Sequence, residues 1–413
     1  MGNQKIYDCA VIGGGAAGML AAIRMGRNGL NVILIEHTKK IGNKILQTGN
    51  GKCNFTNLRM EEDCYLGDNQ REIMSVIERF NQKAVISFFE SIGVYHRERN
   101  GYVYPHSDTA LSLQNALRME IEHLKIRVST EFDIREIKRN GRVFELMGDS
   151  YTYYANTVLL ATGSKAAPKS GSDGSGYELA KKLGHQVVKP LPALVQLVSN
   201  GKTCRMMAGV RSQGTVKLFI DDRLAAEEFG ELQYTDYGIS GIPVFQLSRY
   251  AVKAVDEKRK VHLVIDMLPD YSEEYIMRIV ETGIQQAGFK NMEQFMEGIL
   301  NRKLVSAAVE ESGISLKHNI TEIGSEKVLA FMKQLKSFTM QITGFKDFDS
   351  AQVCQGGVKL SEIDMSTMMS MKVPGLFFAG EILDVDGKCG GYNLQWAWSS
   401  GAAAAVGVEK FLK

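Results

Sequence analysis

The chain of 413 residues has few features that would commit it to metal, disulfide or membrane chemistry. Its six cysteines form no Cys-x-x-Cys pair and its seven histidines form no His-x-x-x-His pair. This spacing predicts neither a metal site nor a redox-active disulfide, and we expect the thiols to be reduced. No apolar run reaches the roughly 18–20 residues that a membrane-spanning helix needs, so no membrane partner is expected.

The net charge is also small. The 49 Lys and Arg residues nearly balance the 47 Asp and Glu residues and leave a formal charge of +2. That balance gives no electrostatic reason to expect a nucleic-acid partner. The first residues lead directly into an apolar strand without a signal-peptide pattern, and Ile6 stands where a myristoylation signal needs Ser or Thr. These absences predict a cytoplasmic protein, and they leave its oligomeric state open.

The most informative stretch that is present follows Asp8. An apolar run from Cys9 to Ile12, typical of a buried parallel strand, leads into Gly13-x-Gly15-x-x-Gly18 and then into a helical pattern. In a dinucleotide-binding turn the first glycine permits the tight turn, and the second lets a pyrophosphate approach the backbone. The third allows strand and helix to pack closely. The phosphates would lie at the helix N-terminus, where unpaired N–H groups favour an anion.

A second apolar strand begins at Asn31 and ends on Glu36, 18 positions beyond Gly18. An acid at this position accepts hydrogen bonds from a ribose and would repel a 2′-phosphate. A lone glycine motif also occurs in ordinary surface turns. Strand, turn, helix, strand and acid together favour an adenine dinucleotide over that alternative.

A polar, glycine-rich segment from His37 to Asn57 follows the acid directly. It has no strand alternation and room for one helical turn, so a plain surface loop is one interpretation. Its lysines and asparagines lie where a loop would wrap the pyrophosphate and reach the reactive end of a cofactor. We therefore favour a functional role.

Periodicity and turn residues predict the elements that follow. We expect a helix over 71–92, a hairpin that turns on Asn100-Gly101 and a helix from Ala110 to Leu124. Short strands are predicted at 126–129, 134–138, 143–147 and 151–154, and an apolar strand from Thr157 closes on Ala161-Thr162-Gly163.

Changes in the periodicity of apolar residues along the chain predict three domains. Strand alternation replaces the first pattern near Lys189–Pro192, and helical periodicity replaces the strands after Pro269. An apolar strand from Val373 then ends at Gly380-Glu381, and glycines precede a final helix of small residues. The predicted division is a discontinuous domain of 1–190 and 350–413, a β-rich insert of 191–265 and 336–349, and a helical insert of 266–335.

Several sequence blocks together resemble a bacterial family of FAD-binding oxidoreductases described as aminoacetone oxidases or NAD(FAD)-utilising dehydrogenases. The blocks are Gly13–Gly18, Lys44–Asn54, Ala161–Gly163, Gly357, Gly380–Gly387 and Gly390–Gly401. The resemblance covers essentially the whole chain. It implies an α/β fold: a Rossmann-type FAD domain like that of glutathione reductase, with an inserted β-barrel-like domain and a small helical domain. Cys354 and Lys388-Cys389 depart from the usual family residues, which bears on substrate preference rather than on FAD binding.

The resemblance also implies which residues bind non-covalent FAD. They are Gly13, Gly15, Ala16, Ala17 and Gly18 at the pyrophosphate; Glu36 at the adenosine ribose, with His37 beside it; Lys44, Gly51, Lys52, Cys53 and Asn54 towards the pyrophosphate and isoalloxazine; Ile134 at the adenine, with Ala161, Thr162 and Gly163 nearby; Gly380 and Glu381 at the ribityl chain; and Gly391, Tyr392, Asn393 and Leu394 at the pyrimidine edge of the flavin.

The reaction itself is less determined by the sequence. No side chain stands out as a general base, and Cys53 has no neighbouring redox cysteine, so we predict no catalytic residue. The glycines of 171–176 follow no strand of their own, so there is no second Rossmann unit for a nicotinamide.

Two reactions on a small molecule therefore remain: oxidation of an amine or amino ketone, and reduction of an activated alkene with NADH or NADPH as transient electron donor. The inserts would cover the open flavin face and select the substrate. A tRNA-modifying flavoprotein and a flavin-binding module with little turnover are the alternatives, and the near-neutral charge disfavours the first.

Overall fold

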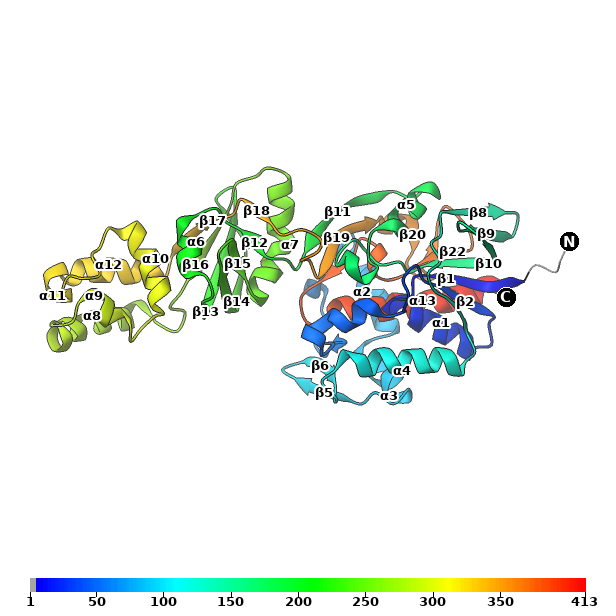
Figure 1. Ribbon diagram of the computed structural model, residues 1–413, viewed down its shortest axis with the longest axis horizontal. Coiled ribbons are helices and arrows are strands. Elements are labelled where there is room, and N and C mark those ends of the chain that lie inside the picture. Colours follow the sequence, from blue (N-terminus) through cyan, green and yellow to red (C-terminus); the bar gives the residue numbers. More distant parts are fainter. Residues whose placement is uncertain (1–4) are drawn as a thin grey trace. The chain divides into compact units, whose positions relative to one another are not determined.

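The structure is a computed structural model that describes residues 5–413 (Figure 1). Residues 1–4, on which the signal-peptide expectation of the sequence analysis falls, lie outside the described part. The chain forms two compact units: unit 1 extends up to Pro192 and resumes over Ala351–Lys413, and unit 2 is Ala193–Ser350. Unit 2 contains both predicted inserts, and the division into three domains stays a proposal.

The core of unit 1 is a parallel sheet. Its central strands, in spatial order, are β22 (Leu376–Phe378), β10 (Thr152–Leu160), β1 (Ile6–Ile12), β2 (Val32–Ile35) and β7 (Arg127–Ser129). The residues of β1 from Cys9 to Ile12 are all buried, which explains why this strand reads as a continuous apolar run. The α/β Rossmann-type fold predicted from the sequence is confirmed.

Antiparallel strands extend this sheet, and other strands and helices surround it. The extensions are β8 (Glu136–Asn140), β9 (Val143–Met147), β20 (Ile363–Asp364) and β21 (Met369–Ser370). The strands outside this sheet are β3 (Thr56–Asn57), β4 (Tyr65–Leu66), β5 (His96–Arg99), β6 (Tyr102–Pro105), β11 (Val187–Ala193), β19 (Val353–Val358) and β23 (Asp386–Gly387). The helices are α1 (Ala16–Arg27), α2 (Gln70–Arg79), α3 (Gln82–Ser91), α4 (Ala110–His123), α5 (Ser175–Lys182) and α13 (Tyr392–Leu412).

The C-terminal helix α13 packs against α1 at close range. A Cβ added at Gly401 would lie 2.6 Å from the carbonyl oxygen of Ala17, so only glycine fits there. Of the 21 residues of α13, 14 are buried, including Trp396 and Trp398. The small-residue run therefore brings the end of the chain onto the glycine turn at its beginning.

In two places the structure divides the chain of unit 1 into elements differently from the prediction. The single helix expected over 71–92 is two helices, because the Asn81 side chain caps α3 by accepting hydrogen bonds from the N–H groups of Lys83 and Ala84, both at 3.1 Å. The strands expected at 151–154 and from Thr157 are one strand, β10. Its residues before Thr157 already pair with both β9 and β1, so nothing interrupts it.

Unit 2 contains an antiparallel sheet and a set of helices. The strands, in spatial order, are β17 (Phe338–Gln341), β16 (Val261–Asp266), β13 (Arg211–Ile220), β14 (Arg223–Thr235), β15 (Gly238–Ser240), β12 (Leu197–Val198) and β18 (Gly344–Phe345). The helices are α6 (Lys202–Met207), α7 (Ile242–Asp256), α8 (Glu273–Ala287), α9 (Met292–Met296), α10 (Arg302–Ser312), α11 (Ile320–Ile323) and α12 (Ser325–Leu335). Among the described helices, none is long and apolar enough to cross a membrane.

Helix α7 lies where the sequence analysis expected only strands. It begins with Pro243 in its first turn, and Val244, Leu247 and Ala251 recur at helical spacing and are buried. These are ordinary signals of a helix start and of an amphipathic helix. The alternation of apolar and polar residues in the flanking strands obscured these helix signals in the sequence.

Candidate functional site

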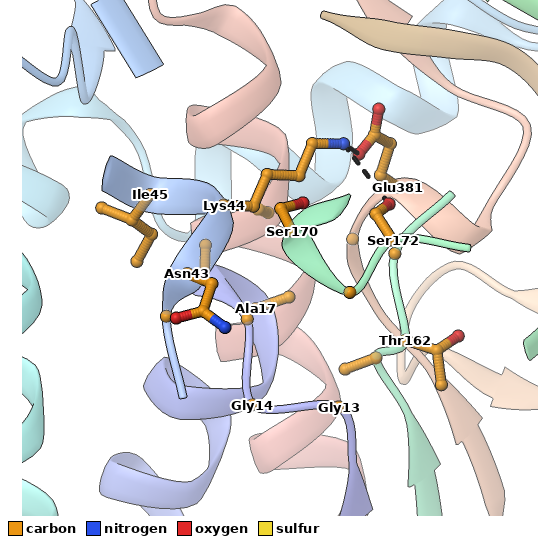
Figure 2. A pocket seen from close by; sticks show the side chains of 18 of the residues that line it. Gly13, Gly14, Ala17, Asn43, Lys44, Ile45, Thr162, Ser170, Ser172 and Glu381 are labelled. Carbon is orange, nitrogen blue, oxygen red and sulfur yellow. Dashed lines mark hydrogen bonds and ion pairs between the residues drawn. The ribbon is translucent and has the colours of Figure 1, made fainter. Parts of the chain in front are cut away.

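A cleft opens in unit 1 beside the glycine turn, and Figure 2 shows part of its lining. It contains about 880 Å³ of empty space, part of it open to solvent, which suits a small-molecule or cofactor site. The residues that the sequence predicted and that line it are Gly13, Gly15, Ala16, Ala17, Glu36, Lys44, Ala161, Thr162, Gly163, Gly380, Glu381, Asn393 and Leu394. A smaller hollow shares Gly13, Glu36 and Thr162 with the cleft and is also lined by His37 and Ile134.

The other predicted residues line neither hollow. These residues are Gly18, Gly51, Lys52, Cys53, Asn54, Gly391 and Tyr392. Their contacts with a cofactor stay predictions. Lys52 is exposed, whereas Cys53 is fully buried. Burial raises the pKa of the Cys53 thiol to about 12, which keeps it protonated and unsuited to act as a nucleophile.

The three motif glycines have different reasons to be glycine. A Cβ at Gly13 would lie 2.4 Å from the carbonyl oxygen of Ala161, and one at Gly18 would lie 2.0 Å from that of Gly13. The fold therefore requires both. A Cβ at Gly15 would meet nothing within 4 Å, although Gly15 lines the cleft. No protein atom fills this space, which suits the predicted close approach of a pyrophosphate to the backbone.

Glu36 is fixed at the end of β2 by the backbone. One carboxylate oxygen accepts a hydrogen bond from the N–H of Gly14 at 2.8 Å, and the other accepts one from the N–H of Thr38 at 2.9 Å. Each oxygen keeps a free lone pair, because a carboxylate oxygen accepts about two hydrogen bonds. The carboxylate is thus oriented in the cleft and still able to accept from ribose hydroxyls.

Replacing Glu36 with Ala should weaken FAD binding by about 1–3 kcal/mol, the usual loss for a charged hydrogen bond. The measurement is equilibrium FAD binding to the variant and to the native chain. Glu36→Gln is the matched control: it keeps an acceptor and should lose less. Equal affinity of native and Ala variant would place the ribose elsewhere.

Two buried polar atoms near the cleft have no hydrogen-bond partner within the described chain. Thr162 lines the cleft, and its hydroxyl oxygen is buried and unpartnered. The side-chain oxygen of Asn54 is also buried and unpartnered, and it lies 2.9 Å from where a Cβ on Gly391 would stand. Unpartnered buried polar groups are costly, so the Thr162 hydroxyl fits a cleft completed by a bound ligand, whereas Asn54 lines neither hollow.

The start of α13 meets the cleft through Asn393 and Leu394. The Asn393 side chain is already engaged, because it accepts from the N–H of Gly387 at 2.8 Å and donates to the Gly387 carbonyl at 2.9 Å. It therefore holds the turn in place. The predicted contact with the pyrimidine edge of a flavin would therefore fall to the backbone N–H groups of α13, at the positive end of the helix dipole.

Sequence reasoning missed part of the lining. The glycines of 171–176 were noted only as following no strand of their own, yet Gly171 and Ser172 line the cleft. The other lining residues that were not predicted include Ser170, Thr38, Asn43, Thr48, Gln352 and Val353. A Cβ at Gly171 would lie 2.8 Å from the Thr38 methyl carbon. The position of this loop in the chain could have indicated its role. The loop directly follows the strand that ends in Ala161-Thr162-Gly163, at the same sheet edge as Glu36.

The described residues contain no group of three or more His, Cys, Asp or Glu side chains that is arranged to hold a metal ion. Two of the residues that depart from the resembled family, Cys354 and Cys389, carry thiols whose pKa burial raises to about 11. Both thiols are therefore protonated near neutral pH. Cys354 contributes instead through its backbone, because its N–H donates to Glu381 at 3.2 Å.

The parallel sheet, the glycine turn, the fixed acid and the cleft define a Rossmann-type dinucleotide-binding protein. The chain belongs to the family described as "HI0933-like protein Rossmann domain", whose model matches residues 7–407. The resemblance read from the sequence is thereby confirmed. The protein is an oxidoreductase and FAD is its cofactor. The open space at Gly15 and the oriented carboxylate of Glu36 fit that cofactor.

Three relatives span nearly the whole chain. It is 37% identical over 396 residues to the 3-dehydro-bile acid delta(4,6)-reductase of Clostridium scindens, covering 95% of this chain and 97% of the relative. It is 30% identical over 412 residues to the ribosomal RNA dihydrouridine synthase of Haemophilus influenzae, covering 97% and 98%. The Escherichia coli protein of the same name is 29% identical over 403 residues, covering 97% of each chain.

Among solved structures, the 3-ketosteroid delta1-dehydrogenase of Sterolibacterium denitrificans has a similar fold. The TM-score is 0.51 at 12% identity, covering 98% of this chain and 99% of that one. The relatives named for ribosomal RNA mean that the expected absence of a nucleic-acid partner is not confirmed.

Proposed function

We propose that this protein is an FAD-dependent reductase of a carbon–carbon double bond conjugated to a carbonyl group in a small molecule, with NADH or NADPH as transient electron donor. The observation that carries the proposal is chemical agreement between relatives that act on different molecules. A delta(4,6)-reductase of a 3-dehydro bile acid and a dihydrouridine synthase are both named for adding two hydrogens to such a double bond. Both relatives span nearly the whole chain.

The residues of the cleft support this reaction by binding and orientation. FAD, when bound, supplies hydride transfer. Glu36 would orient the adenosine ribose, the space at Gly15 would admit the pyrophosphate, and the α13 N-terminus would favour negative charge at the pyrimidine edge. The cysteine thiols of the region are held protonated by burial, so no covalent step is assigned to them. We name no catalytic side chain.

We favour a polycyclic small molecule as substrate, because the bile-acid reductase shares 37% identity with this chain and the Haemophilus influenzae dihydrouridine synthase shares 30%. The charge balance points the same way, since RNA binding relies on an excess of Lys and Arg at phosphates and the net charge here is +2. A steroid-like enone combines an apolar ring system with the required conjugated carbonyl.

Reduction of a uridine in RNA is the second candidate. It rests on the two dihydrouridine synthases, which match as much of this chain as the bile-acid enzyme does. In that case the partner would be a nucleic acid and not a small molecule. The protein would then be an RNA-modifying flavoprotein, as in the alternative given from the sequence, but acting on ribosomal RNA. Oxidation of an amine has no such support, because each of the three relatives is named for a reduction or for its product.

Anaerobic reduction of the FAD-loaded protein separates these reactions. NADH or NADPH should bleach the visible absorbance of the flavin within catalytic turnover times, whereas aminoacetone and other primary amines should leave it unchanged. Free FAD at the same concentration is the control for non-enzymatic reduction. Bleaching by an amine, with no response to either nicotinamide, would reject the reductase in favour of the oxidase.

A further inference from the structure

A single ion pair joins two walls of the cofactor cleft. Lys44 comes from the 3-10 segment Asn43–Gly51 that follows β2, and Glu381 comes from the 3-10 turn Gly380–Ile382 that follows β22. The Lys44 ammonium lies 2.6 Å from one carboxylate oxygen of Glu381, and both side chains line the cleft (Figure 2). The side chains are 25% and 18% exposed, so the pair is shielded but within reach of a ligand.

The two partners are not equally fixed. The second carboxylate oxygen of Glu381 accepts a hydrogen bond from the backbone N–H of Cys354 at 3.2 Å, which anchors the acid. Lys44 has a long flexible stem, and its further contact is with the Ser172 hydroxyl at 3.5 Å. If the pair opens, Lys44 is the partner that moves.

A dinucleotide brings into this cleft a pyrophosphate with two negative charges. Of the carboxylates that line the cleft, Glu36 is already held by two backbone N–H groups, whereas Glu381 holds Lys44. A diphosphate and Glu381 would thus compete for the same ammonium group. A charge-assisted hydrogen bond to phosphate is of the same kind as the one lost, so the exchange is energetically feasible.

We propose that FAD binding exchanges the partner of Lys44: the ammonium leaves Glu381 for the pyrophosphate, and the released carboxylate accepts hydrogen bonds from ribityl hydroxyls. Lys44 is then a cofactor-binding residue for whose ammonium group Glu381 competes, and Glu381 sets how readily a diphosphate binds. The inference rests on the assignment of this cleft to FAD. The new element is the competition between Glu381 and the diphosphate for the Lys44 ammonium group. The positions of Lys44 and Glu381 in the sequence do not imply it.

ADP is the probe that isolates the exchange, because it has the diphosphate, ribose and adenine but no ribityl chain. Its dissociation constant is measured by calorimetry on the full-length chain freed of FAD, for the native protein, Glu381→Gln, Lys44→Met and the double variant. The exchange predicts that Glu381→Gln tightens ADP binding about tenfold, because Lys44 no longer has a competing anion. In the Lys44→Met background the same change should alter the constant less than about twofold.

The cycle distinguishes the exchange from simple repulsion between Glu381 and the diphosphate. If Glu381→Gln tightens ADP binding equally in the native chain and in Lys44→Met, Glu381 acts only by repelling the diphosphate. If Glu381→Gln weakens ADP binding, the intact ion pair holds Lys44 in the position that binds ADP. Either result overturns the proposal. If ADP does not bind the native chain, the cleft assignment itself fails, which is a different result.

Glu120→Gln provides the matched control. Arg27 and Glu120 form an ion pair at 2.8 Å with side chains 36% and 17% exposed, and neither residue lines the described cleft. Its loss should leave the ADP constant unchanged. A tenfold change in this control would show that ADP binding follows general charge or stability rather than Lys44.

Discussion

Replacing Gly15 with Val should abolish FAD binding while leaving unit 1 folded. A Cβ at this position meets no protein atom within 4 Å, and its backbone φ of −81° is one that valine readily adopts. The new side chain would instead fill space that the pyrophosphate needs. We expect affinity for FAD to fall about 100-fold or more, equivalent to about 2.7 kcal/mol.

Trp396 and Trp398 make the folding control direct, because they are the two tryptophans of the chain and both are buried in α13. Their fluorescence and its urea midpoint should match those of the native chain freed of FAD. Gly18→Val is the contrasting variant, since its Cβ would stand 2.0 Å from a backbone oxygen and should prevent folding. Full FAD occupancy in Gly15→Val would refute the pyrophosphate assignment.

Replacing Gly391 with Ala should destabilise unit 1 by about 3 kcal/mol. Gly391 has a φ of +95°, which costs an L-residue roughly 1–2 kcal/mol, and its Cβ would lie 2.5 Å from the carbonyl oxygen of Thr56. Backbone cannot yield as a flexible side chain can, so overpacking adds about 1–3 kcal/mol. The urea midpoint of tryptophan fluorescence measures the loss.

Gly29→Ala separates the two causes. Gly29 has a φ of +82°, but a Cβ there meets nothing within 4 Å, so only the backbone cost of about 1 kcal/mol applies. If Gly391→Ala is no more destabilising than Gly29→Ala, the close contact with Thr56 does not exist in solution.

The glycine turn and the place of Glu36 at the end of its strand were predictable because their signals are local. The strand from Cys9 to Ile12, the spacing of the three glycines and the position of Glu36 are fixed by a few neighbouring residues. The structure adds what spacing cannot say: the fold requires glycine at Gly13 and Gly18, whereas a Cβ at Gly15 would meet no protein atom within 4 Å.

The lining supplied by distant segments was not predictable in the same way. Ser172 reaches Lys44, and Glu381 meets both Lys44 and the backbone of Cys354, only because the strands that precede these loops end at one edge of the sheet. The break between α2 and α3 was nevertheless visible in principle, since Asn81 is a strong helix-capping residue within an otherwise apolar pattern. Helix α7 was hidden by the strand alternation around it.

The central claim, reduction of a conjugated double bond, has one direct test. The FAD-loaded protein is reduced anaerobically with one equivalent of NADH or NADPH and then mixed with a steroid 4,6-dien-3-one, and, in a parallel sample, with ribosomal RNA. We predict that the steroid restores the oxidised flavin spectrum and yields one saturated carbon–carbon bond per flavin. Reoxidation by the RNA alone, with dihydrouridine formed, would support the second candidate. If neither restores the spectrum and oxygen does, the protein is not a reductase of this kind.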